Sequence, residues 1–164
     1  MIPAVLQTFD TPDPGGIDIA FSLGSGAAST FLTTLLVGAI LVALAPDYTE
    51  GKISEVRENP VGAFVYGLFA LLALLVLSLI LFITIVGVPV AVALLVAAIV
   101  LWAIGAAIAF LAIADSLVGH DDGWLVPLVL AAGINGGLAL TGIGGLVSFV
   151  LGAIGFGTVL RGLL

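Results

Sequence analysis

The only side chains grouped in the way that metal ligands or acid–base catalysts are grouped lie at His120, Asp121 and Asp122. One histidine beside two adjacent carboxylates lacks the spaced ligand set of a zinc site. A solvated connector between helices, in which Asp121 or Asp122 caps the next helix, is the simpler interpretation. The chain has no cysteine, which excludes thiolate metal sites and disulfides. We therefore expect no metal, cofactor or catalytic residue.

Two long stretches contain no Asp, Glu, Lys, Arg or His: Pro60 to Ala114 and Trp124 to Leu160. Ionisable residues inside a membrane mark proton relays, ion coupling and voltage sensing. Their absence argues against a proton-coupled pump or an intramembrane protease, and we predict that the protein is not an enzyme. A pore lined by backbone and hydroxyl groups stays possible.

Asn135 is the most polar side chain expected at mid-membrane depth. An unpaired amide in lipid costs roughly several kcal/mol, so Asn135 should face another helix. Hydrogen bonding between helices is the favoured interpretation, and binding a ligand or lining a conduit is the alternative. A channel would turn Asn135, Thr141 or the hydroxyls of Thr30, Thr33 and Thr34 toward a wet axis.

Small residues are concentrated near the C-terminus, where 11 of the 22 glycines lie in the last 42 residues. Small residues spaced along one helix face let two backbones approach closely. The positions predicted to pack helices, together with Asn135, are Gly105, Gly133, Gly137, Gly144, Ser148 and Gly152. Packing inside one chain and self-association between copies both agree with this pattern.

The composition decides which solvent surrounds these elements. Apolar residues make up 62% of the chain and charged residues 8%, whereas soluble domains are about half apolar and a quarter charged. One small core could not hide so much apolar surface, so the lipid bilayer is the expected partner. The apolar runs are continuous and do not alternate as barrel strands do, which favours helices.

The net charge of −7 disfavours nucleic acid as a partner, because nucleic-acid binding depends on basic contacts. Loops rich in acid and poor in lysine suit a cytoplasm of high salt. We therefore expect a halophilic archaeal source, with ordinary loop acidity as the alternative.

The sequence predicts an all-α integral membrane fold, a five-helix bundle made of one helix and two helical hairpins. The 55 residues from Pro60 to Ala114 cross a bilayer twice, since a span needs about 20 residues. Asn59 and Pro60 predict a helix start, as N-cap and first helical residue. The last 37 uncharged residues form either one span with an apolar tail or two short spans. With two, the transmembrane domain of residues 26–164 has spans at 27–45, 60–84, 88–114, 124–140 and 145–161.

Each hairpin contains a glycine turn, and the two turns resemble each other. Thr84 to Gly87 aligns with Thr141 to Gly144, either as an internal repeat or by chance in apolar sequence. We expect Gly87 in the left-handed conformation that ends a helix and Pro89 in the first turn of the next. If the turns meet, Thr84, Gly87, Pro89, Thr141 and Gly144 would form an outward-facing concavity for an anion, a lipid headgroup or a partner's backbone.

Residues 1–25 are polar and rich in Gly and Pro, which predicts an irregular extracellular arm without the basic start of a signal peptide. With five spans, Lys52, Arg57 and Arg161 fall on one side of the membrane. Positive residues favour the cytoplasm, so we expect a multi-pass protein of the plasma membrane with its N-terminus outside and its C-terminus inside.

The segments Ala45 to Tyr48, Val56 to Pro60 and Leu79 to Val90 (LILFITIVGVPV) carry a family resemblance. Together they are similar to the membrane domain of bactofilin-like, polymer-forming cytoskeletal proteins of archaea and bacteria. The resemblance covers about residues 30–164 and implies one helix, a charged linker and two hairpins. The β-helical polymerising domain of those proteins has no counterpart in the 25-residue arm, so filament formation is not implied, and no catalytic residues are carried over.

These observations favour a non-catalytic membrane scaffold or accessory subunit that acts through helix packing, in a homo-oligomer or a larger membrane complex. The alternative is a small oligomeric channel or transporter lined by Ser, Thr, Asn and Gly. Ion flux from proteoliposomes would separate the two.

Overall fold

The computed structural model describes residues 14–163, with side chains from Ser22 onward. The described residues form six helices and no strand, which confirms the all-helical fold. The helices are α1 (Pro14–Leu44), α2 (Pro46–Glu58), α3 (Pro60–Phe82), α4 (Gly87–Val118), α5 (Leu125–Ala139) and α6 (Gly144–Arg161). Four helices are long and apolar enough to cross a membrane, namely α1 over Ser22–Leu44, α3, α4 and α6, whereas α5 has only 15 residues.

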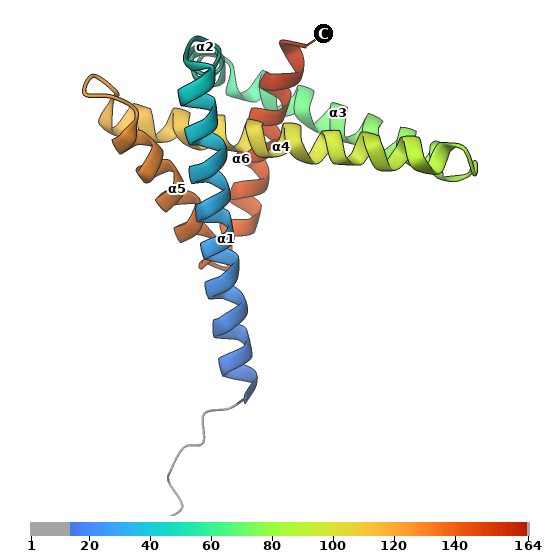
Figure 1. Ribbon diagram of the computed structural model, residues 1–164, viewed down its shortest axis with the longest axis horizontal. Helices are drawn as coiled ribbons and strands as arrows, with labels where there is room; N and C mark the ends of the chain where they lie inside the picture. Colours follow the sequence, from blue (N-terminus) through green and yellow to red (C-terminus); the bar gives the residue numbers. More distant parts are fainter. Residues whose placement is uncertain (1–13, 164) are drawn as a thin grey trace, which may run out of the picture.

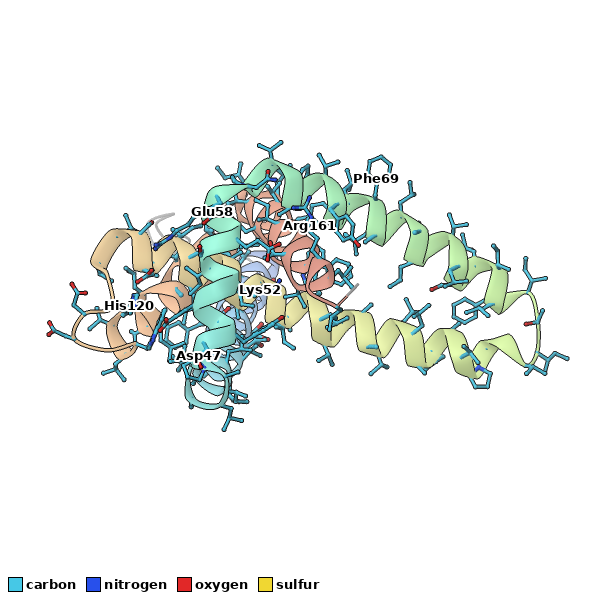
Figure 2. The ribbon with its side chains drawn as sticks, turned by 90° about the horizontal axis from the view of Figure 1, so that it is seen from above. Asp47, Lys52, Glu58, Phe69, His120 and Arg161 are labelled. Atoms are coloured by element: carbon cyan, nitrogen blue, oxygen red, sulfur yellow. The ribbon has the colours of Figure 1, made fainter. Side chains whose placement is uncertain are left out.

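The count of five helices was wrong because the charged linker that was expected between the first two spans contains a further helix, α2 (Pro46–Glu58). Pro46 supplies the first helical position, Asp47 lies in the first turn and Arg57 in the last, which suits the helix dipole. Its buried residues, Thr49, Ile53 and Val56, are spaced four and three apart and so share one face. α2 is therefore an amphipathic helix that lies across the bundle, as the helix carrying Asp47, Lys52 and Glu58 does in Figure 2.

The irregular arm expected at 1–25 is wrong for residues 14–25. α1 begins at Pro14, so residues 14–25 are helical, and residues 1–13 lie outside the described part. The helix start at Asn59 and Pro60 is confirmed. Pro60 is the first residue of α3, and the Asn59 side chain accepts a hydrogen bond from the Gly62 N–H at 2.9 Å.

Both expected hairpin turns are present, and they have the same backbone pattern. Thr84 donates its hydroxyl to the Leu81 carbonyl at 3.1 Å, and Thr141 donates to the Leu138 carbonyl at 2.8 Å. The glycine three residues after each threonine begins the next helix. The alignment of the two turns therefore reflects a shared Thr-x-x-Gly hairpin geometry.

Gly87 is not left-handed, contrary to expectation, because the only positive-φ glycines in the described chain are Gly119 and Gly123. Gly87 is needed for space instead. A Cβ at Gly87 would collide with the Leu81 carbonyl oxygen, and one at Gly144 would collide with the Leu138 carbonyl oxygen. The turn brings the carbonyl six residues back directly against the glycine.

The centre of the fold is a crossing in which α6 lies between α3 and α4, near the open end of their hairpin (Figure 2). A Cβ at Gly155 would overlap the Gly105 backbone on α4, and one at Gly157 would overlap the Ala63 carbonyl on α3. Backbone therefore meets backbone on both sides of α6, which residues larger than glycine would prevent.

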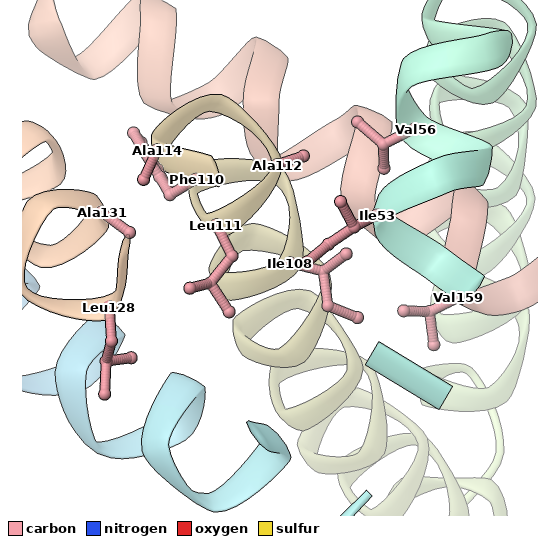
Figure 3. Packing of buried hydrophobic residues seen from close by; sticks show 10 residues of the cluster. All are labelled: Ile53, Val56, Ile108, Phe110, Leu111, Ala112, Ala114, Leu128, Ala131 and Val159. Atoms are coloured by element: carbon pink, nitrogen blue, oxygen red, sulfur yellow. The ribbon is translucent and has the colours of Figure 1, made fainter. Parts of the chain in front are cut away.

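Around this crossing, the middle of α4 is fully buried. Ile108, Phe110 and Leu111 have no exposed surface and pack with residues from α2, α5 and α6 (Figure 3). The rest of the cluster is Ile53, Val56, Ala112, Ala114, Leu128, Ala131 and Val159. Beyond it, the far half of the α3–α4 hairpin and the first half of α1 extend away in different directions (Figure 1).

Candidate functional site

The predicted packing residues separate into those with partners inside the chain and those without. Gly105 contacts Gly155 across the α4–α6 crossing, and Gly152 lies against the Trp102 indole. Gly144 is the first residue of α6 and lies against the Leu138 carbonyl oxygen of α5. By contrast, a Cβ at Gly133 or Gly137 on α5 would have no neighbour within 4 Å.

Asn135 joins three helices, as the favoured interpretation expected. Its Nδ2 donates to Thr34 Oγ1 on α1 at 2.7 Å, and its Oδ1 accepts from Ser148 Oγ on α6 at 3.2 Å. Asn135 is only 8% exposed. A buried amide held from two directions fixes the register of α5 against both neighbours.

The same three side chains line a cavity of about 240 Å³ between α1, α4, α5 and α6.

 The lining of this cavity carries no charged group. Hydroxyls of α1 face aromatic and small residues of α4 across it. Its full lining is Ser29, Thr30, Thr33, Thr34, Trp102, Ala103, Ala106, Phe110, Asn135 and Ser148. The hydroxyls considered as a channel lining are thus brought together with Asn135, inside a single chain.

Thr141 does not belong to this group, and the concavity expected from the two turns is wrong. The turn between α3 and α4 lies at the far tip of that hairpin, whereas the turn between α5 and α6 lies near the middle of the molecule (Figure 1). Thr84, Gly87 and Pro89 therefore do not meet Thr141 and Gly144. The hairpins point in different directions because α6 crosses α3 and α4 instead of running beside them.

A second polar cluster lies where α2 crosses the end of α4, and the sequence reasoning missed it. Asp115, whose side chain is 4% exposed, pairs with Arg57 at 2.6 Å and with His120 Nδ1 at 2.6 Å. The His120 ring stacks on Trp124 with 4.3 Å between ring centroids. These four residues border a cavity of about 330 Å³, which is also lined by Glu50, Ile53, Ser54 and Glu58.

The local sequence explains part of this cluster. Gly119 and Gly123 have φ of +69° and +106°, a conformation that favours glycine, and they fold the loop so that His120 returns to Asp115. The two glycines on either side of His120 were the available signal. Nothing in the sequence linked Asp115 to Arg57, which lies 58 residues earlier.

The expected cap at Asp121 or Asp122 is wrong, since Trp124 is the N-cap of α5 and no side chain caps it. In the described part of the chain, no group of three or more His, Asp or Glu side chains is arranged to hold a metal ion.

Lys52 and Arg57 lie on α2 and Arg161 lies at the C-terminal end of α6, and these two parts share one end of the molecule (Figure 1). Lys52 donates to the Thr158 carbonyl at 2.9 Å, and Arg161 donates to the Gly62 carbonyl at 2.6 Å. Lys52 thereby bonds a carbonyl in the last turn of α6, where the helix dipole favours a cation. These contacts hold α2, α3 and α6 together at that end.

Comparison with known proteins gives one result. A family model described as "Domain of unknown function (DUF8173)" matches residues 4–164. No curated protein and no solved structure matches the chain. The resemblance to bactofilin-like proteins is corrected by this match, because the family found over nearly the whole chain is a different one and no bactofilin or polymer-forming cytoskeletal family is detected. The chain belongs to the DUF8173 family.

Proposed function

We propose that this protein is a non-catalytic multi-pass membrane scaffold or accessory subunit that associates with copies of itself or with a larger membrane complex. The observation that carries the proposal is the bare glycine face of α5. Gly136 packs against Ala27 and Phe31 of α1, whereas a Cβ at Gly133 or Gly137 would have no neighbour within 4 Å in the described chain. Glycine in a helix interior costs about 1 kcal/mol relative to alanine, so two unused glycines point to packing outside the chain.

The length of α5 supports the same proposal. Its 15 residues extend about 22 Å, less than the roughly 30 Å of hydrocarbon that a span must cross. Val126, Val129 and Leu140 are exposed beside the two glycines. A short apolar helix with an open small-residue face gains from a neighbouring helix, which covers its ends as well as its side.

The direct test replaces both bare glycines. The double variant Gly133→Leu, Gly137→Leu should weaken self-association in lipid nanodiscs or mild detergent by about tenfold or more, which corresponds to about 1.4 kcal/mol. The measurement is the molar mass of the purified protein across a concentration series. Gly26→Leu on α1 is the matched control, since a Cβ there also has no neighbour within 4 Å.

Two outcomes would contradict the proposal. The natural protein could remain a monomer with no co-purifying chain at every concentration, or the double variant could associate as strongly as the natural protein. Loss of association in Gly26→Leu alone would move the interface from α5 to α1.

A channel is the second candidate function, and the uncharged cavity bordered by Asn135 favours it. The cavity lies inside one chain, so conduction through it would not need a ring of subunits. Proteoliposomes test this function through ion and solute flux, with Asn135→Leu as the variant that should abolish it. Flux equal to that of protein-free liposomes would remove this candidate.

We place the protein in the plasma membrane with its N-terminus outside and its C-terminus in the cytoplasm. The grouping of Lys52, Arg57 and Arg161 at one end supports this orientation, because positive residues favour the cytoplasmic side. α1 begins at the opposite end of the molecule (Figure 1).

A further inference from the structure

We infer that the cavity between α1, α4, α5 and α6 is a binding site for a small uncharged solute that forms hydrogen bonds, of the polyol or amide class. Its 240 Å³ would hold several water molecules at about 30 Å³ each, so a solute of a few heavy atoms fits. Binding of such a solute requires neither self-association nor conduction.

The cavity holds hydrogen-bonding groups that the protein itself leaves unused. An asparagine amide offers two N–H donors and an oxygen with two lone pairs. Asn135 uses one donor on Thr34 and one lone pair on Ser148, which leaves one of each for a guest. The half-buried Trp102 indole also borders the cavity, and its N–H makes no hydrogen bond within the described chain.

The hydroxyls of α1 extend this set toward the outside. Ser29 and Thr33 line the cavity, are exposed, and make no side-chain hydrogen bond in the described residues. Asn135 lies at the buried end. The cavity therefore has exposed hydroxyls on the side of α1 and a buried amide at its inner end.

The lining also determines the class of solute. No charged residue borders the cavity, so an ion would enter without a counter-charge at a high cost. The rings of Trp102 and Phe110 and the methyl groups of Ala103 and Ala106 form one wall, which suits the carbon skeleton of an organic solute. Both features favour a neutral solute with polar and apolar sides.

Tryptophan fluorescence can report on this cavity directly. The chain has two tryptophans, and Trp124→Phe leaves Trp102, in the cavity wall, as the only one. In nanodiscs, we expect acrylamide, a small neutral amide, to quench Trp102 several-fold more strongly than iodide does. Glycerol should reduce the quenching by acrylamide, whereas sucrose at equal viscosity should not.

Variants locate the effect. Ser29→Leu at the exposed rim should reduce acrylamide quenching at least twofold without disturbing the fold, and Asn135→Leu should remove the protection by glycerol. Ser116→Leu, on an exposed serine of α4 outside the cavity, is the matched control. Equal quenching by iodide and acrylamide, no protection by glycerol, or no effect of Ser29→Leu would each overturn the inference. The Gly133→Leu, Gly137→Leu background shows whether binding survives the loss of self-association.

Discussion

At the scale of single residues, Asp115 stands out because it is a carboxylate whose side chain is almost fully buried. A buried carboxylate is costly unless it is paired and hydrogen-bonded, and here each oxygen has its own partner. Arg57 comes from α2 and His120 from the loop after α4, so one carboxylate fastens two separate segments to the end of α4. Arg57 also donates to the Ala112 carbonyl at 3.2 Å.

Removing this carboxylate should therefore destabilise the fold. We expect Asp115→Ala to lower the free energy of unfolding by about 2 kcal/mol, because hydrogen bonds to charged groups contribute about 1.5–3 kcal/mol. Glu58→Ala is the control, since Glu58 is exposed and bonds only Ser54, and it should cost less than about 1 kcal/mol. SDS-driven unfolding in mixed micelles, followed by far-UV circular dichroism, measures both. Equal losses in the two variants would show that Asp115 holds nothing in place.

At the scale of helices, what could be predicted from the sequence is what neighbouring residues determine. The hairpin turns were placed correctly because Thr84 and Gly87 interact only with residues of the same short segment. The cap at Asn59 was also predictable, because its side chain bonds the N–H of Gly62, three residues later. α2 was missed because its many charged residues suggested a loop, although Thr49, Ile53 and Val56 have the spacing of one helix face.

Contacts between distant helices could not be predicted in the same way. Gly105 was recognised as a packing residue, but its partner Gly155 lies 50 residues further on and belongs to a second run of glycines with similar spacing. Asn135 was expected to bond across helices, yet the choice of Thr34 and Ser148 depends on how α6 crosses α4. Sequence patterns locate the faces of helices, and the crossing angles decide which faces meet.

The α4–α6 crossing gives the prediction at this scale. Gly155→Ala should lower the free energy of unfolding by about 1–3 kcal/mol, because its Cβ has no space beside the Gly105 backbone. Gly145→Ala, on the same helix, should cause no loss, since a Cβ there has no neighbour within 4 Å. Thermal unfolding of both variants in the same detergent is the measurement. A neutral Gly155→Ala would mean that the helices cross further apart than they do here.

At the scale of the whole molecule, the apolar helices do not all run in one direction. The α3–α4 hairpin extends across the direction of α1 (Figure 1). Its tip is apolar and open, with Ile85 94% exposed. Within this turn the Thr84 carbonyl accepts hydrogen bonds from Gly87 and Val88, and the side chains that the turn exposes are apolar. The tip is therefore suited to lipid and not to water.

This arrangement leads to a labelling prediction, made simpler by the absence of cysteine. Ile85→Cys should not react with a membrane-impermeant maleimide in intact cells or after permeabilisation, because the tip stays in lipid. Asp121→Cys, in the exposed loop tied to α2 by Asp115 and Arg57, should react only after permeabilisation if that end is cytoplasmic. Unfolding in SDS must expose both cysteines equally, which confirms that each can react. Rapid labelling of Ile85→Cys from outside would instead place the tip in water and make the hairpin a full crossing of the membrane. Labelling of Asp121→Cys in intact cells would reverse the proposed orientation.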